Sequence, residues 1–330
     1  MQKAPNHDIL KGLTIGVLYG GPSSEREVSI ESGENAAKAL ESAGHQVHRV
    51  LLDGTFNVRD ARSLGIDVAL LALHGEFGED GKIQSILEEA DIPYTGSGID
   101  ASSRAFDKVL AKQAFERHSV RTPAWMSVDM PQAILDSNVE KLCDLNPPVV
   151  IKPATGGSSL GVTIVREKNQ VEDALRKAAE YGDCVLIERF IKGRELTVGV
   201  IGEEALPVAE LKVPGEFYDY NAKYSDERTR IVCPAELDPD LAARVRALGL
   251  AAHRALGCRD VSRTDIILDE SGMLWVLEVN TIPGMTSHSL LPRAAGAVGI
   301  SFAELCEGLL RLAVERAMRR ASTTVPEAVC

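Results

Sequence analysis

The sequence lacks any long apolar segment. Its longest uninterrupted apolar run, residues 68–73, has six residues, whereas a helix that spans a bilayer needs about 20. The first residues, MQKAPNHDILKG, lack the apolar centre of a signal peptide. We therefore expect a soluble, cytoplasmic protein with no membrane partner.

Positive charge and closely spaced cysteines are also scarce. The chain has 36 lysines and arginines against 48 aspartates and glutamates, a net charge of −12, which would repel a nucleic-acid backbone. Its six cysteines are scattered without a CxxC motif, so nothing indicates a zinc knuckle or a disulfide framework. With 330 residues and 45% hydrophobic residues, the chain has the composition of a globular protein of two or three domains.

The order of apolar patterns divides the chain into three parts. The first hundred residues alternate short apolar runs with helical patterns, a βαβ rhythm that predicts a parallel sheet. The first helix should begin after the loop GGPSSE, with Ser24 and Glu27 as a capping box. We predict an α/β protein with an N-terminal Rossmann-like domain at 1–104, a central domain at 105–189 and a C-terminal domain at 190–330.

The segment VSRTDIILDESGMLWVLEVN contains two β-rich runs around a turn, which predicts a hairpin. With Leu268 opposite Met273, Arg263 faces Glu278. The period of two in a strand then places four polar side chains on one face: Arg263, Asp265, Glu278 and Asn280. Two carboxylates and an amide oxygen suit a hard cation such as Mg²⁺. The alternative is an ordinary solvated strand face, which the strongly apolar flanks disfavour.

The run NTIPGMTSHSLL follows this hairpin and offers hydrogen-bond donors. Pro283-Gly284 forces a turn that exposes backbone N–H groups, and Ser287, His288 and Ser289 lie next to it in the sequence. We expect a carboxylate or an oxyanion to dock there.

The segment VVIKPATGGSSLGVTIV predicts a strand, a glycine-rich loop and a second strand. Three glycines free the backbone, two serines add hydroxyl groups and Lys152 supplies positive charge, so the loop is suited to fold over phosphates. It is not a Walker A loop, because no Lys-Ser/Thr pair and no helix follow Gly161. A plain hairpin turn is the alternative.

Two other enzyme classes share fragments of sequence with this chain. Residues 157–161 read G-x-S-x-G, and Asp265 and His288 follow in the chain order of a serine hydrolase. A nucleophile elbow needs a helix after the serine, whereas a strand is predicted here. Residues 96–101 imitate a dinucleotide fingerprint but lack its opening strand and following helix arrangement.

Several motifs together resemble one family. GGPSSEREVS, ALHGEFGEDG, PYTGSG, IKPATGGSSLGV, FYDYNAKY and RTDIILD with LEVNTIPGMTSHSLLP occur in the order typical of the D-alanine–D-alanine ligases, which belong to the ATP-grasp superfamily. The resemblance extends from about Leu13 to Leu312. It implies three α/β domains with ATP between the central and C-terminal ones, a cytoplasmic enzyme that makes the peptidoglycan dipeptide, and a homodimer.

The resemblance implies a role for residues at the nucleotide. Lys108 and Lys152 would contact the phosphates, Glu188 the adenine and Glu195 the ribose, while Lys223 would reach the transferred phosphoryl group. The same resemblance assigns two Mg²⁺ (or Mn²⁺) ions to the polar hairpin face, with these ligands: Asp265, Glu278 and Asn280.

The resemblance also implies a site for two D-alanine molecules. Glu25 would bind the first ammonium group and form a network with Ser158 and Tyr224, with His74 nearby. The remaining assignments are an oxyanion hole at Arg263 and the Gly284 N–H, and a site for the second carboxylate at Ser289 and Leu290. Two positions depart from the family, in which many members have glutamate: Gly156 and Asn221.

Such an enzyme would activate the first carboxylate as an acyl phosphate, which the amine of the second D-alanine then attacks. Two alternatives stay open. A D-alanine–D-lactate ligase would use the same residues with a hydroxyl nucleophile, although Tyr224 favours the dipeptide. A catalytically silent nucleotide-binding relative would have lost Arg263 or the metal carboxylates, and this chain retains them.

Overall fold

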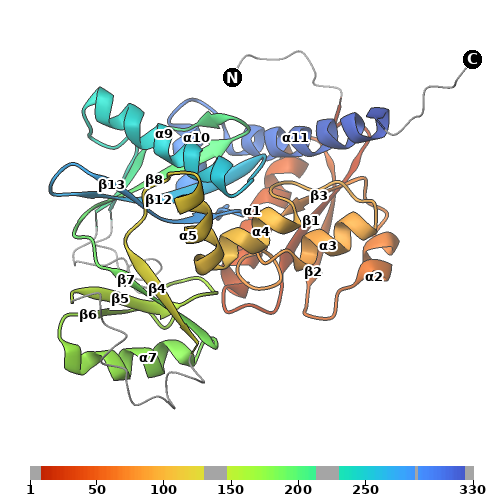
Figure 1. The fold of residues 1–330 in the computed structure, drawn as a ribbon. Coiled ribbons are helices and arrows are strands. Elements are labelled where there is room, and N and C mark those ends of the chain that lie inside the picture. Colours follow the sequence, from red (N-terminus) through yellow and green to blue (C-terminus); the bar gives the residue numbers. More distant parts are fainter. Residues whose placement is uncertain (1–8, 130–146, 213–229, 287–288, 324–330) are drawn as a thin grey trace, which may run out of the picture.

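The computed structural model describes residues 9–129, 147–212, 230–286 and 289–323. These residues form three β-sheets with helices packed around them (Figure 1). Within the described residues, no helix is both long and apolar enough to cross a membrane. The expected mixture of helices and strands is confirmed, and the predicted domain ranges stay predictions.

The N-terminal sheet is parallel, as predicted. Its strands run in the order β2-β1-β3: β1 (Thr14–Gly20), β2 (Gln46–Leu52) and β3 (Val68–Leu71). Helix α1 (Arg26–Ser42) connects β1 to β2 and packs on both strands. Three shorter helices follow in the chain: α2 (Val58–Ser63), α3 (Lys82–Glu89) and α4 (Ile99–Phe106). Strands β1 and β3 are apolar and almost entirely buried, whereas the edge strand β2 is largely exposed.

The predicted capping box of the first helix is wrong by one residue. Glu25, not Ser24, is the N-cap of α1, and its side chain makes no capping hydrogen bond. The preceding Ser23 instead donates its hydroxyl to the His74 carbonyl at 2.6 Å, which fixes the turn before the helix. The Glu25 carboxylate is therefore free of the helix end and available to other partners.

The middle sheet is antiparallel, with strand order β4-β7-β5-β6. Its strands are β4 (Trp125–Asp129), β5 (Val149–Pro153), β6 (Thr163–Val165) and β7 (Cys184–Arg189). Helix α5 (Lys108–Arg117) precedes the sheet in the chain. A short 3₁₀ turn, η2 (Lys168–Gln170), leads into α7 (Val171–Ala179), which packs on β5.

The third sheet contains the predicted hairpin and follows the order β11-β10-β8-β12-β13, with β9 beside β8. The strands are β8 (Gly193–Ile201), β9 (Glu204–Ala205), β10 (Ala209–Lys212), β11 (Arg230–Val232), β12 (Val261–Asp269) and β13 (Leu274–Asn280). Helix α9 (Pro239–Ala255) packs on β8 and β12. Asp238 caps it and Pro239 is its first residue.

The N-terminal sheet packs against the last helices of the described chain. After the short helix α10 (Leu290–Gly296), the long helix α11 (Phe302–Thr323) lies along α1 and β3 of the N-terminal sheet (Figure 1). Residues of both regions share one apolar core that includes Val17, Val68 and Leu310. The N-terminal sheet is thus held directly by the C-terminal part of the chain.

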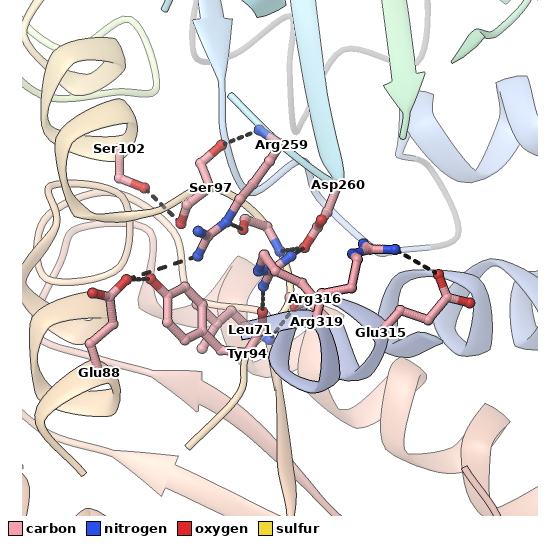
Figure 2. A network of polar contacts seen from close by, with 12 residues as sticks. Leu71, Glu88, Tyr94, Ser97, Ser102, Arg259, Asp260, Glu315, Arg316 and Arg319 are labelled. Atoms are coloured by element: carbon pink, nitrogen blue, oxygen red, sulfur yellow. Dashed lines mark hydrogen bonds and ion pairs between the residues drawn. The ribbon is translucent and has the colours of Figure 1, made fainter. Parts of the chain in front are cut away.

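A network of polar contacts links α11 to the segments around Tyr94 and Asp260 (Figure 2). Arg316 of α11 forms an ion pair with Asp260 and donates to the Tyr94 carbonyl at 2.6 Å. Asp260 also accepts the Gly96 N–H at 3.1 Å, and the Arg259 guanidinium lies 5.4 Å from the centre of the Tyr94 ring. Since Asp260 immediately precedes β12, the network fixes the start of the strand that carries the polar hairpin face.

Candidate active site

A cavity of about 510 Å³ opens between the middle and third sheets. Apolar strand residues such as Val150 and Ile267 form part of its wall. Most of the predicted site residues in the described parts of the chain line it: Lys108, Lys152, Ser158, Glu188, Glu195, Arg263, Asp265, Glu278 and Leu290. Residues from five separate segments of sequence therefore meet in one place.

A buried carboxylate paired with two lysines lies at one side of the cavity. Lys152 of β5 donates to Glu188 of β7, and the Nζ atom of Lys112 lies 2.7 Å from the other Glu188 oxygen. Burial alone would raise the pKa of the Glu188 carboxyl, but the charges of Lys152 and Lys112 lower it to about 2. Glu188 therefore stays ionised at neutral pH.

The glycine-rich loop closes onto Glu25. Ser158 donates its hydroxyl to the Glu25 carboxylate, although the two residues are 133 positions apart in the sequence. A Cβ atom at Gly157 would come 2.6 Å from the other Glu25 oxygen, so only glycine permits this close approach. Strand β6, not a helix, follows the loop. This arrangement confirms the predicted strand-loop-strand and excludes a nucleophile elbow at Ser159, the central serine of the G-x-S-x-G pattern.

The predicted pairing of the hairpin is wrong, but its polar face is right. Leu268 pairs with Leu274 and Asp265 pairs with Glu278, because the register shifts by one residue between them. A regular pairing continued from Leu268 would turn Glu278 toward the core, alongside Val276. The extra residue, Leu277, reverses this alternation, and both Leu277 and Glu278 line the cavity.

Asp265 is the centre of a polar cluster on this face. Arg263 binds its carboxylate with both Nε, at 3.0 Å, and Nη2, at 2.8 Å. The hydroxyl of Thr197 on β8 donates to Asp265 at 2.7 Å, and the Asn280 amide donates at 3.4 Å. The cluster joins three of the four side chains that the sequence placed on one face, with Thr197 as an additional member, and Glu278 is the cross-strand neighbour of Asp265.

The donors on this face fit a magnesium ion. Asp265 and Glu278 lie directly opposite each other and supply carboxylate oxygens, and Asn280 supplies an amide oxygen if the amide is turned. Among the described residues, the Glu278 carboxylate has no hydrogen-bond or ion-pair partner. The described residues contain no group of three or more His, Cys, Asp or Glu suited to a metal. A metal here would therefore need ligands from its substrate and water.

Glu25 also lies near a second acidic group, Glu79, which the sequence did not single out. The Glu79 carboxylate accepts the Gly75 N–H at 2.8 Å and the Ile282 N–H at 3.4 Å. Burial, followed by the charge of Glu25, raises the pKa of Glu79 to about 8. In the sequence, Glu79 is marked only by its place in the motif HGEFGEDG. In the structure, its carboxylate links the loop after His74 to Ile282, two residues before Gly284.

His74 is buried at the same end of the site, with 6% of its surface exposed. Its Nε2 atom lies 3.2 Å from the Ser32 hydroxyl, which also accepts the Met285 N–H at 3.1 Å. Burial lowers the pKa of His74, and the Glu25 charge opposes this shift only in part. His74 is therefore neutral at pH 7.

The turn at Pro283-Gly284 lies close to Ser289. A Cβ atom at Gly284 would come 2.7 Å from the Ser289 hydroxyl oxygen, which accepts the Thr286 N–H at 2.9 Å. Within the described part of the chain, the Gly284 N–H donates no hydrogen bond. It therefore remains available to a ligand, as an oxyanion-hole donor must be.

Comparisons with known proteins agree on one family. Residues 55–97 match the model "D-ala D-ala ligase N-terminus", and residues 115–311 match "D-ala D-ala ligase C-terminus". A D-alanine–D-alanine ligase of Bordetella avium is 44% identical over 302 residues, covering 90% of this chain and 93% of the relative. One of Anaeromyxobacter is 44% identical over 299 residues, covering 91% and 96%. The chain belongs to the D-alanine–D-alanine ligase family.

Solved structures show the same relationship to the ligase family. The D-alanine–D-alanine ligase of Bacillus anthracis has a TM-score of 0.83 at 36% identity, covering 93% of this chain and 99% of that one. Its complex with ATP has a TM-score of 0.80 at 32% identity, with the same coverage. The D-Ala:D-Ser ligase VanG of Enterococcus faecalis has a TM-score of 0.80 at 27% identity, covering 91% and 99%. The predicted ATP-grasp fold class is confirmed.

Some of the ligase residues predicted from sequence cannot be placed. Lys223, Tyr224 and His288 lie outside the described residues, as does the departing position Asn221. The other departure, Gly156, has a φ of 101°, a conformation in which a side chain is strained. Glycine at this position is therefore consistent with the shape of the loop.

Proposed function

We propose that this protein joins two D-alanine molecules to D-alanyl-D-alanine at the expense of ATP, for peptidoglycan synthesis in the cytoplasm. The observation that carries the proposal is the meeting of three groups at one cavity: the Lys152–Glu188 pair, the Asp265–Glu278 face and the Glu25–Ser158 contact. Named ligases of the same family support the choice of substrate. A homodimer is expected from the family resemblance alone.

ATP would lie between the middle and third sheets, with its phosphates toward the glycine-rich loop. Lys108 and Lys152 would bind the phosphates, and Glu188 and Glu195 would bind the adenine and the ribose. Glu188 suits its role because it lines the cavity and the charges of Lys152 and Lys112 keep it ionised, so it can accept a hydrogen bond from an amino group of the base. Lys223 is expected to reach the transferred phosphoryl group.

Asp265, Glu278 and Asn280 would hold the magnesium ions, which neutralise phosphoryl charge when bound. A carboxylate is a poor electrophile, so phosphoryl transfer to the first D-alanine must precede attack by the second. Positioning and electrostatics contribute most of this step. An acyl phosphate hydrolyses in water. The contact of the glycine-rich loop with Glu25 would hold the loop over the site and keep water away from this intermediate.

The first D-alanine would lie between Glu25 and the hairpin face. The Glu25 carboxylate, held by Ser158, would bind the ammonium group, with neutral His74 beside it. Arg263 and the Gly284 N–H would stabilise the tetrahedral oxyanion, a contribution of about 10²–10³ in rate for one such donor. Ser289 and Leu290 would receive the carboxylate of the second D-alanine.

Product analysis tests the proposal. The purified protein should convert D-alanine, ATP and Mg²⁺ into D-alanyl-D-alanine and ADP, detected by mass spectrometry, and excess chelator should stop the reaction. With equal D-alanine and D-lactate at pH 7.5, the dipeptide should predominate. A predominance of D-alanyl-D-lactate would establish the hydroxyl-using alternative, and no product with bound ATP would indicate a catalytically silent relative.

A further inference from the structure

Lys112 is a fully buried lysine behind the nucleotide end of the cavity. It lies on α5, four residues after Lys108, and only 1% of its side chain is exposed. It is not among the residues that line the cavity. Burying an ammonium group is costly unless the charge is paired, so a residue that merely fills this space would be apolar.

Two oxygen atoms hold the Lys112 ammonium group. Its Nζ atom lies 2.7 Å from Glu188 Oε2 and donates to the Thr122 hydroxyl, also at 2.7 Å. Thr122 in turn donates to the carbonyl of Val276 at 2.8 Å, immediately before the irregular part of β13. Lys112 is thus fixed between the middle sheet and the metal-binding hairpin.

The two lysines on Glu188 have different surroundings. Lys152 contacts Glu188 Oε1 and lines the cavity, where a ligand can reach it. Lys112 contacts Oε2 from the protein interior. One buried carboxylate therefore has two ammonium partners, one within reach of a bound molecule and one permanently withdrawn from it.

We propose that Lys112 is a positioning residue that keeps Glu188 paired when Lys152 turns to the phosphates of bound ATP. Without Lys112, Lys152 would have two poor alternatives. It could stay paired with Glu188 and make no contact with the phosphates, or it could bind the phosphates and leave the buried Glu188 carboxylate unpaired. Lys112 thereby allows one lysine to serve the phosphates while the carboxylate beside it remains ionised. This inference rests on the proposed nucleotide site and adds a residue to it.

The proposal predicts a loss that is specific to phosphates. Adenosine lacks phosphates, so Lys152 can remain with Glu188 when adenosine binds. We measure dissociation constants of Mg·ATP and adenosine without D-alanine, by calorimetry or by competition against a fluorescent nucleotide. In Lys112→Met, the ratio of the adenosine constant to the ATP constant should fall at least tenfold from the parent value. The ratio reports on the folded fraction alone, so partial unfolding does not obscure it.

A second substitution tests whether charge is the cause. Adding Glu188→Gln to Lys112→Met removes the carboxylate that needs a partner, so the preference for ATP should recover to within about threefold of that of Glu188→Gln alone. Lys177→Met, at an exposed lysine of α7, should leave the ratio unchanged and serves as the control.

Three results would overturn the proposal. An unchanged ratio in Lys112→Met would show that Lys112 does not govern the phosphate contacts, whatever happens to overall affinity. An equal fall of the ratio with and without Glu188→Gln would assign Lys112 a role in packing. A parent protein that binds ATP no better than adenosine would instead refute the nucleotide site itself, and the inference with it.

Discussion

Glu278 is the member of the hairpin face whose role is easiest to test. Its carboxylate faces the cavity with no partner among the described residues, so it is available to a metal. Glu278→Gln preserves size and removes charge, and should lower Mg²⁺-dependent turnover by at least about 10²-fold while the melting temperature changes little.

Titration of Mg²⁺ against steady-state ADP release measures this effect. Glu270→Gln, at an exposed carboxylate in the turn of the same hairpin, is the matched control and should behave like the parent. If Glu278→Gln turned over ATP normally at low Mg²⁺, Glu278 would not be a metal ligand.

Glu79 makes stability depend on pH. Its pKa is raised to about 8, chiefly by burial and then by Glu25. The folded state holds this proton more tightly than the unfolded chain, so the contribution to stability is full below about pH 4.5 and is lost as pH rises through 8. Glu79→Gln removes this titration. The melting temperature of the parent, relative to that of the variant, should therefore fall between pH 5 and pH 8.5.

Glu76→Gln provides the control for this measurement, because Glu76 is an exposed carboxylate in the same loop. Its melting temperature should follow that of the parent across the same pH range. A constant difference between Glu79→Gln and the parent at every pH would show that Glu79 titrates normally.

Tyr224 was assigned from the family resemblance and lies outside the described residues. Because Ser158 and Glu25 are in contact, a phenol hydroxyl that joined them would complete a three-residue network. Tyr224→Phe should keep acyl phosphate formation, make less dipeptide and gain some D-alanyl-D-lactate at acidic pH, where the competing ammonium cannot attack. Mass spectrometry of products at pH 6 and pH 8.5 measures this. If Tyr224→Phe made the two products in the same ratio as the parent at both pH values, Tyr224 would not determine the choice of nucleophile.

At the level of elements, the position of α1 determines where Glu25 lies. Gly33 of α1 packs against Tyr19 of β1, and an added Cβ would come 2.3 Å from the ring. Gly33→Ala should push the helix away from the sheet, reduce the free energy of unfolding by about 1–3 kcal/mol and lower D-alanine-dependent activity because Glu25 moves with the helix.

Gly308→Ala in α11 is the matched control. An added Cβ there meets nothing within 4 Å, and alanine is about 0.5–1 kcal/mol better than glycine inside a helix. Chemical denaturation should show a small gain in stability with normal activity. A loss of similar size in both variants would indicate that helix propensity, not the contact with Tyr19, decides the outcome.

The β12–β13 hairpin shows what local sequence patterns can and cannot predict. Alternation correctly placed Asp265 and Glu278 on one face, but the assumed pairing of Leu268 with Met273 was wrong. The irregularity at Leu277 has no local signature, because it depends on which residues fit the core behind the strand. A helix start such as Asp238-Pro239, by contrast, is encoded within a few residues, because the capping side chain and the proline are neighbours in the sequence.

At the scale of the whole molecule, the sequence indicated the family and several residues that line the cavity, but not the contacts between distant segments. Lys112 and Glu79 gain their roles from neighbours far away in the chain, Glu188 and Ile282. The packing of α11 on the N-terminal sheet and the Arg316–Asp260 pair (Figure 2) likewise depend on the assembled fold. No periodicity or motif in either segment specifies such a partner.

The central claim is that ATP turnover by this protein is driven by D-alanine. The most direct measurement is phosphate release from Mg·ATP with D-alanine, L-alanine or D-lactate as the sole added substrate. The account predicts rapid release with D-alanine and only background release with L-alanine or D-lactate. The reason is that the ammonium and carboxylate groups of a D-amino acid must contact Glu25 and Arg263 at the same time. Equal release with L-alanine, or none above background with D-alanine, would contradict it.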